Sequence, residues 1–324
     1  MKSKNFRDFD EFSASVRDVD AVMMLQNPSR RRWTISQVNV DGIDVQLGQL
    51  GSGNIVEGQS WSSGTLLYLP LSHRVSYSAN GIDFGQNQFM ALEPSCEFCL
   101  STKFAHDWCS IFVPTENPIG DGDPPEPSLA PPISEVGRCR VTLADRQLAA
   151  SAYSIVKEVI IASANSSRFE TSPAAKSAGV ELRKVVPLVL GEMQPVESNR
   201  PGRRNIPRSQ IIYSCRELVR ERNGRPIRVD ELAATAGVSE RTLRLAFHEW
   251  FGLGPARYLQ LRQLHQVYWT LRRMGPEVGR VGDVLADFGV WEFGRFASRY
   301  RRLFGELPSQ TRRRMGSVLS PTRF

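Results

Sequence analysis

The chain has 324 residues, of which 41% are hydrophobic, so it is long enough for two domains with buried cores. No apolar run approaches a membrane span, no secretory signal follows the charged start, and five cysteines do not make a disulfide framework. We therefore expect a soluble, cytoplasmic chain with no membrane partner.

Charge is distributed unevenly along the sequence. Residues 1–198 hold 17 Lys and Arg against 23 Asp and Glu, whereas residues 199–324 hold 24 against 11, and all 24 basic side chains there are Arg. This asymmetry predicts an acidic module joined to a module that meets a polyanion. Arg also favours forked contacts to phosphates and guanine edges. The alternative is an arginine-rich surface without a partner.

The first 115 residues predict mostly β-structure. Residues 6–32 suggest a short helix followed by a turn, which includes Arg30, Arg31 and Arg32. From about residue 33 to 115, short alternating runs such as 34–40 are separated by frequent glycines. That texture is typical of a small barrel or sandwich.

A proline-rich loop over residues 118–132 is followed by two helical patterns within about 141–193. The first carries a stripe of Leu148, Ile155 and Val159. That stripe predicts either a dimer seam or packing against the β-structure, and the sequence leaves both open. Residues 196–208 are polar and rich in Pro and Arg, as expected of an interdomain linker.

Residues 209–324 predict an all-α domain that contains the same helix-turn-helix pattern twice. In the first copy Gly237 supplies a left-handed turn residue, Ser239 caps the second helix, and Leu243 returns to the core. The second copy has its turn glycine at Gly289, 52 residues later. The first turns of such second helices enter the DNA major groove, and two of them one DNA turn apart, about 34 Å, would enter successive grooves. The outward positions of the first copy are Glu240, Arg241, Thr242, Arg244 and His248.

The stretch from residue 229 to 314 resembles the DNA-binding domain of the AraC/XylS transcriptional regulators. The first copy contributes the run 236–243 with Phe247, followed by Gly252, Pro255, Tyr258, Leu259 and Arg262. The second contributes Gly289, Arg295, Phe296, Tyr300, Arg301 and the run 304–309. The resemblance implies a double helix-turn-helix DNA-binding domain over 209–324. It also implies a β-rich, cupin-like sensor with dimerisation helices over 1–195. The start of the chain loosely resembles the ethanolamine-utilisation regulators.

The resemblance also implies roles for individual residues. Arg241 and Arg244 fall where the family reads bases from the first helix, with Ser239 and Glu240 beside them. In the second helix the corresponding positions are Glu292, Gly294, Arg295 and Ser298. Three further positions are better suited to phosphate contacts, namely Thr242, Arg299 and Arg301. Phosphate contacts position a protein on DNA without reading its sequence.

The sequence departs from the family pattern mainly in the second copy. Leu285 stands where Ala is usual, Trp291 occupies the expected cap position, and Gly294 within a helix costs about 1 kcal/mol relative to Ala. In the first copy Leu245 replaces a usual Arg. We therefore expect the second copy to be softer and to contribute less specificity.

Other candidate sites are weak. Cys96 and Cys99, with His106 and Cys109 nearby, suggest a metal or redox site, but no second pair follows at finger spacing, so buried packing is favoured. The side chains of Arg74, Tyr77 and Trp108 fit either a ligand pocket or ordinary packing. No phosphate loop or nucleophile elbow occurs. The sequence therefore predicts no enzyme, cofactor or metal.

These observations predict a ligand-responsive activator that binds promoter DNA. By resemblance, an effector of unknown identity received by the first half changes how the second half sits on DNA and recruits RNA polymerase. A signal can do so only if it binds two states of the protein with different affinity. The same resemblance leads us to expect that two protein chains form a homodimer. The alternative is a constitutive DNA-binding protein without a small-molecule signal.

Overall fold

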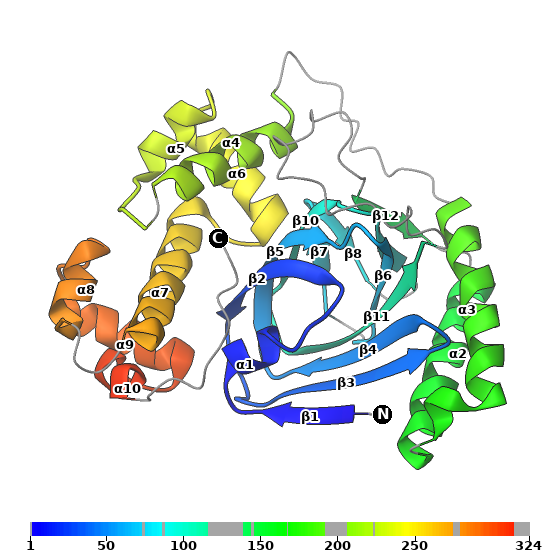
Figure 1. Cartoon of the computed structure of the whole chain (residues 1–324). Coiled ribbons are helices and arrows are strands. Elements are labelled where there is room, and N and C mark those ends of the chain that lie inside the picture. Colours follow the sequence, from blue (N-terminus) through cyan, green and yellow to red (C-terminus); the bar gives the residue numbers. More distant parts are fainter. Residues whose placement is uncertain are drawn as a thin grey trace, which may run out of the picture. The chain divides into compact units, whose positions relative to one another are not determined.

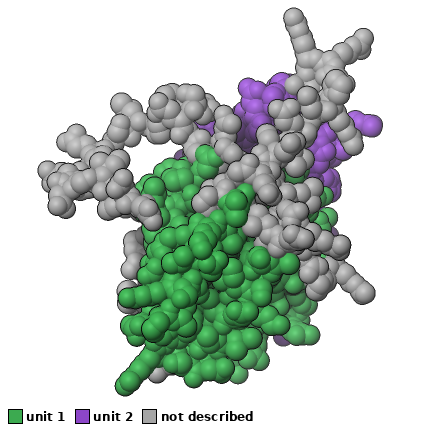
Figure 2. Space-filling model, turned by 90° about the vertical axis from the view of Figure 1, so that its right-hand side faces the viewer, with its two compact units in different colours: residues 1–23, 29–199 green, residues 24–28, 200–324 purple. Residues whose placement is uncertain are grey.

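A computed structural model describes residues 2–72, 75–85, 88–115, 139–143, 146–166, 168–191, 206–222, 224–274 and 279–313. The chain divides into two compact units, coloured separately in Figure 2. Unit 1 comprises Met1–Met23 and Ser29–Asn199, and unit 2 comprises Met24–Pro28 and Arg200–Phe324. The predicted loop 118–132 and most of the predicted linker 196–208 lie outside the described residues, so the domain limits stay a prediction.

The β-rich part contains two antiparallel sheets (Figure 1). The first has the order β1-β3-β4-β11-β6-β9-β12 and the second the order β2-β5-β10-β7-β8. A β-rich first half is therefore confirmed. The strands are β1 (Lys2–Phe6), β2 (Val19–Gln26), β3 (Trp33–Val40), β4 (Ile43–Leu50), β5 (Gly53–Ser60), β6 (Gly64–Pro70), β7 (Tyr77–Ala79), β8 (Ile82–Phe84), β9 (Gln88–Leu92), β10 (Glu97–Thr102), β11 (His106–Pro114) and β12 (Cys139–Leu143).

Two hairpins show how local sequence sets the strand register. Asp41 and Gly42 join β3 to β4 with φ of 53° and 85°, and Asn80 and Gly81 join β7 to β8 with φ of 48° and 81°. Two-residue loops with both φ values positive match the right-handed twist of the flanking strands, and Asp-Gly and Asn-Gly adopt them readily.

The β-structure extends beyond the predicted range of 33–115 at both ends. Where a helix and turn were expected over 6–32, the helix is limited to α1 (Phe9–Ser13), and Val19–Gln26 forms strand β2. The prediction was wrong there because β2 is an apolar run without alternation, which periodicity does not separate from a helix. Likewise, Cys139–Leu143 pairs with β9 as a strand, although helix was expected from about residue 141.

Helices α2 (Arg146–Asn165) and α3 (Pro173–Gly191), joined by the short helix η1 (Phe169–Thr171), lie side by side (Figure 1). Val156, Val159 and Leu182 are buried in one cluster with β-strand side chains such as Val38 and Ile111. Because this face packs within unit 1, the packing alternative explains Val159, and Ile155 lies partly buried against the same cluster. The Leu148 side chain lies outside the described residues.

Unit 2 is helical, as predicted. Its first helix begins at Arg208, directly after Pro207. Helix α7 runs between a group formed by α4, α5 and α6 and a second group formed by α8, α9 and α10 (Figure 1). Among the described residues, no helix has the length and apolar character needed to cross a membrane. The helices are α4 (Arg208–Glu221), α5 (Val229–Thr235), α6 (Glu240–Phe251), α7 (Pro255–Arg273), α8 (Val281–Asp287), α9 (Phe293–Phe304) and α10 (Pro308–Arg313).

Candidate DNA-binding surface

The turn between α5 and α6 is built around Gly237, whose φ is +64°. Its backbone N–H donates to Ala234 O at 3.1 Å, and the N–H of Val238 donates to Ala233 O at 3.0 Å. A residue with a Cβ is sterically strained in this left-handed conformation, whereas glycine adopts it without that cost. The turn fixes the angle at which α6 leaves α5.

Helix α6 has a buried face and an exposed face. Ser239 caps it by accepting a hydrogen bond from the backbone N–H of Thr242 at 3.2 Å. Leu243, Phe247 and Phe251 are buried, each at 1% exposure or less. The opposite face exposes all of the predicted readers of the first copy, which are Glu240, Arg241, Thr242 and Arg244, as well as Leu245 and His248.

The second copy repeats the turn with the same hydrogen bonds. Gly289 has φ of +69°, its N–H donates to Ala286 O at 2.8 Å, and the N–H of Val290 donates to Leu285 O at 2.8 Å. Leu285 itself is 5% exposed, as is Ala233 at the matching position, so the larger side chain is accommodated. The two copies therefore share the geometry of the leading helix and of the first part of the turn.

The second turn is one residue longer than the first. Ser239 caps α6 two residues after its turn glycine, whereas the cap of α9 is Glu292, three residues after Gly289. The expected cap at Trp291 was therefore wrong, and Glu292 makes no side-chain cap hydrogen bond. Both second helices have 12 residues and end at a left-handed glycine, Gly252 or Gly305.

This extra residue changes which positions correspond. Aligned from their caps, Arg241 of α6 matches Gly294 of α9, and Thr242 matches Arg295. Exposed on α9 and at its cap are all of the predicted second-copy residues, namely Glu292, Gly294, Arg295, Ser298, Arg299 and Arg301.

Several of the candidate readers are paired within their own helix. Arg244 donates to Glu240 Oε2 at 2.6 Å, and Arg295 donates to both carboxylate oxygens of Glu292 at 3.0 and 3.2 Å. The hydroxyl of Ser298 donates to Gly294 O at 3.0 Å. These ion pairs are exposed and individually weak, so a phosphate or a base edge can compete for either guanidinium.

Two aromatic side chains beside the second helix were not predicted as site residues. Trp291 is 79% exposed and Phe293 is 47% exposed, and they flank the cap of α9. The sequence pattern assigns Trp291 to the cap position of the helix and therefore does not predict an exposed aromatic side chain there.

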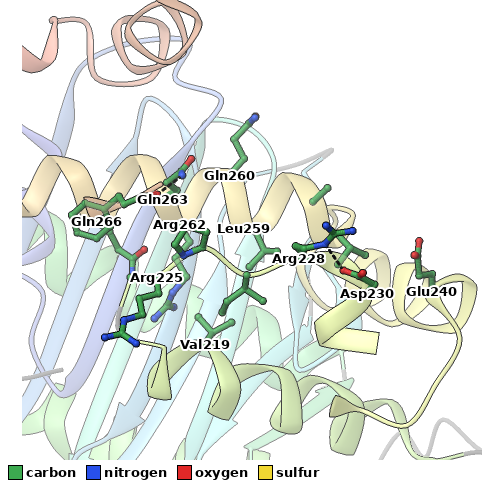
Figure 3. A pocket seen from close by; sticks show the side chains of 16 residues that line it. Val219, Arg225, Arg228, Asp230, Glu240, Leu259, Gln260, Arg262, Gln263 and Gln266 are labelled. Atoms are coloured by element: carbon green, nitrogen blue, oxygen red, sulfur yellow. Dashed lines mark hydrogen bonds and ion pairs between the residues drawn. The ribbon is translucent and has the colours of Figure 1, made fainter. Parts of the chain in front are cut away.

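An open cleft of about 480 Å³ lies along α7, between the start of α6 and the second turn (Figure 3). Arg225, Arg228 and Arg262 line it, and Arg228 Nε donates to Asp230 Oδ1 at 3.0 Å. The Nε of Arg262 is buried and has no hydrogen-bond partner in the described part of the chain. The remaining lining residues include Glu240, Gln260 and Gln266.

One side of this cleft braces the second turn. Gln263 Nε2 donates to Phe288 O at 2.8 Å. A Cβ added to Gly289 would overlap the ring of Pro226, and one added to Gly224 would lie 2.5 Å from Phe288 Cε1. The loop ahead of α5 is therefore packed tightly against the turn of the second copy. This packing links the two copies in addition to α7.

The remaining candidate side chains that the structure describes are buried. Cys96, Cys99 and Cys109 are buried, and the described residues contain no cluster of His, Cys, Asp and Glu that would hold a metal. His106 Nδ1 donates to Phe104 O at 2.9 Å, and burial lowers the pKa of this imidazole to about 4. Tyr77 and Trp108 are buried, whereas Arg74 lies outside the described residues.

Comparison with known proteins agrees with this geometry. A family model described as a helix-turn-helix domain matches residues 232–314. "XylDLEGF operon transcriptional activator 2" of Pseudomonas putida is 35% identical over 95 residues, which are 29% of this chain and 60% of that protein. "XylDLEGF operon transcriptional activator 1" of the same organism is 36% identical over 98 residues, 30% of each chain. A "Probable thc operon regulatory protein" of Rhodococcus erythropolis is 32% identical over 85 residues, 26% of each chain.

The aligned part of this chain thus spans between about a quarter and three fifths of these relatives. A solved structure, "Crystal structure of the AraC-like transcriptional activator CuxR", aligns over 82% of this chain and 95% of that chain. The identity is 12% and the TM-score is 0.42. The family model covers both helix-turn-helix copies, and the matches point to DNA binding rather than to an enzyme. Residues 232–314 thus form a helix-turn-helix domain that is similar in sequence to domains of known operon regulators.

Proposed function

We propose that unit 2 binds promoter DNA sequence-specifically, with α6 and α9 in successive major grooves, and thereby regulates transcription of nearby genes. The observation that carries the proposal is the repeated turn, which exposes one face of each second helix. The 19 residues of α7 between the copies span about 28 Å, which is comparable with one turn of DNA.

Roles for individual residues follow from this placement. Arg241 and Arg244 would read base edges from α6, with Ser239 and Glu240 at its first turn. In the second groove the reading residues would be Glu292, Gly294, Arg295 and Ser298. Phosphate contacts would come from Thr242, Arg299 and Arg301, and from the cleft arginines Arg225, Arg228 and Arg262 between the grooves.

The test is selection of binding sites from a random duplex pool by the full-length protein, followed by affinity measurements at several salt concentrations. We expect a defined sequence and a steep loss of affinity with salt, because phosphate contacts release counterions. Arg241→Ala should lower affinity for the selected site about 10-fold or more. Arg220→Ala is the matched control, since Arg220 is exposed on α4 and pairs with Glu217 at 2.6 Å. Failure to select any sequence, with a flat salt response, would refute the proposal.

We further propose that unit 1 receives a small effector. Gln37, Gln46, Ser110 and Tyr68 are successive register partners across β3, β4, β11 and β6. Their neighbours in sequence belong to the cluster covered by α2 and α3, so these polar side chains point to the opposite face.

That polar row has unused hydrogen-bonding capacity. Gln46 Nε2 donates to Asp18 Oδ2 at 2.9 Å, while Asp18 Oδ1 and the Tyr68 hydroxyl are buried without a partner among the described residues. Buried polar groups are normally paired, so a polar small molecule with both donors and acceptors fits this row.

Two measurements address the effector. DNA affinity with and without cell extract separates a sensor from the alternative, a constitutive DNA-binding protein, because only a sensor should change its affinity. Tyr68→Phe should then weaken the response to extract while leaving basal DNA affinity unchanged. An unchanged response would refute the placement of the effector on this row. Recruitment of RNA polymerase and formation of a homodimer are proposed only from the similarity to operon activators.

A further inference from the structure

We propose that Trp291 and Phe293 form an apolar reading element that recognises the 5-methyl group of thymine in the second major groove. The inference rests on the proposed DNA binding. It starts from the exposure of Trp291, which at 79% is the largest among the exposed bulky hydrophobic side chains of the described residues.

The two copies present opposite chemistry at the same place. The first two positions of α6 are Glu240 and Arg241, whose side chains form hydrogen bonds. The first two positions of α9 are Phe293 and Gly294. Since the first turn of such a helix is the part that enters the groove, the second copy offers apolar surface where the first offers charge.

Gly294 allows the close approach that an apolar contact needs. A Cβ built on it would meet nothing within 4 Å outside its own helix, so the space beside it is open. The longer turn places the exposed Trp291 three residues before Gly294, and the exposed Phe293 directly precedes it. At Gly294 the backbone of α9 can therefore approach the base edges closely.

Charge on the same helix identifies DNA as the occupant. Arg295, Arg299, Arg301 and Arg302 all lie on α9, within nine residues of Phe293. A surface of arginines around an apolar patch suits phosphates that flank a methyl-bearing base edge. In the major groove the thymine methyl is the base feature that apolar side chains contact.

The experiment uses the full-length protein and the duplex that it selects from a random pool. Each thymine of the selected site is replaced in turn by deoxyuracil, which removes the methyl group and keeps the pairing. We expect at least one replacement in one half of the site to weaken binding about 3- to 10-fold, the scale of losing one buried methyl contact.

Variants assign that methyl to the aromatic pair. Trp291→Ala and Phe293→Ala should each weaken binding to the thymine duplex by a similar factor and abolish the difference between thymine and uracil. Both side chains are exposed, so the fold should tolerate either change. Tyr213→Ala is the matched control, because Tyr213 is an exposed aromatic residue, at 45%, on α4 of the same unit.

Three results would overturn the inference. The first is an unchanged thymine preference in both aromatic variants. The second is a variant that binds the selected DNA as the native chain does but activates transcription less in vitro, which would assign the patch to a protein partner. In either case the proposed DNA binding survives. Only failure to select any sequence would remove both.

Discussion

Two turn glycines with the same backbone conformation form a matched pair for testing the brace, by which we mean the packing of Pro226 against the turn at Gly289. Gly237 and Gly289 have φ of +64° and +69°, so an alanine strains the backbone equally at both. Their surroundings differ. A Cβ on Gly237 would lie 3.8 Å from Ile206 Cδ1, an ordinary contact, whereas a Cβ on Gly289 would overlap the ring of Pro226.

The expected magnitudes follow from these contacts. The left-handed conformation costs an alanine about 1–2 kcal/mol. Loss of glycine's freedom in the unfolded chain returns about 0.4–1 kcal/mol. Gly237→Ala should therefore destabilise unit 2 by about 1 kcal/mol. Gly289→Ala adds an overpacking cost of about 1–3 kcal/mol, for a total of about 2–4 kcal/mol.

Hydrogen exchange of the full-length protein, measured by mass spectrometry, reports the opening free energy of α5–α6 and α8–α9 separately. Pro226→Ala removes the ring, so it should recover about 1–2 kcal/mol in Gly289→Ala and nothing in Gly237→Ala. Such non-additivity between two residues is a direct measure of their contact. Equal losses in the two glycine variants, or strictly additive effects with Pro226→Ala, would refute the brace.

Three further predictions concern the caps, the readers and the first unit. Ser239→Ala should destabilise unit 2 by about 1 kcal/mol in urea melts, because α6 loses its only side-chain cap hydrogen bond among the described contacts. Arg241→Ala should lower affinity for a selected DNA site more than Arg295→Ala does, and equal losses would contradict a softer second copy. Burial raises the pKa of Asp18 to about 7, so stability should fall as pH rises from about 4 to 7. Asp18→Asn should flatten that decline in urea midpoints, and an unchanged decline would exclude Asp18 as its source.

The first copy was predictable in detail because its signals are local. Gly237, Ser239 and the spacing of Leu243 and Phe247 each determine a turn, a cap or a buried face within a few residues. In the second copy the 52-residue offset from the first placed the cap at Trp291, and only the backbone shows that the turn takes one more residue.

Other features depend on contacts between distant residues, which periodicity does not reveal. Strand β2 is buried throughout its second half, so its sequence lacks the alternation that marks a strand with one exposed face. The brace joins Pro226 to Gly289 across 63 positions, and neither residue signals the other. The sequence does predict a glycine at 289 for its turn, but not the additional reason that a side chain is excluded there.

The two copies thus form the same helix-turn-helix arrangement with different caps and turn lengths, and this difference affects how each would read DNA. The first helix combines a side-chain cap with charged residues at its first turn, whereas the second replaces both with a longer turn, an aromatic pair and a glycine. If α7 were its only attachment, a less stable second helix would not be held in a fixed orientation. Packing of Pro226 against Gly289, with the hydrogen bond from Gln263, supplies an external constraint instead. Helix α9 can therefore contact bases through apolar side chains instead of hydrogen bonds and still keep a fixed distance from α6.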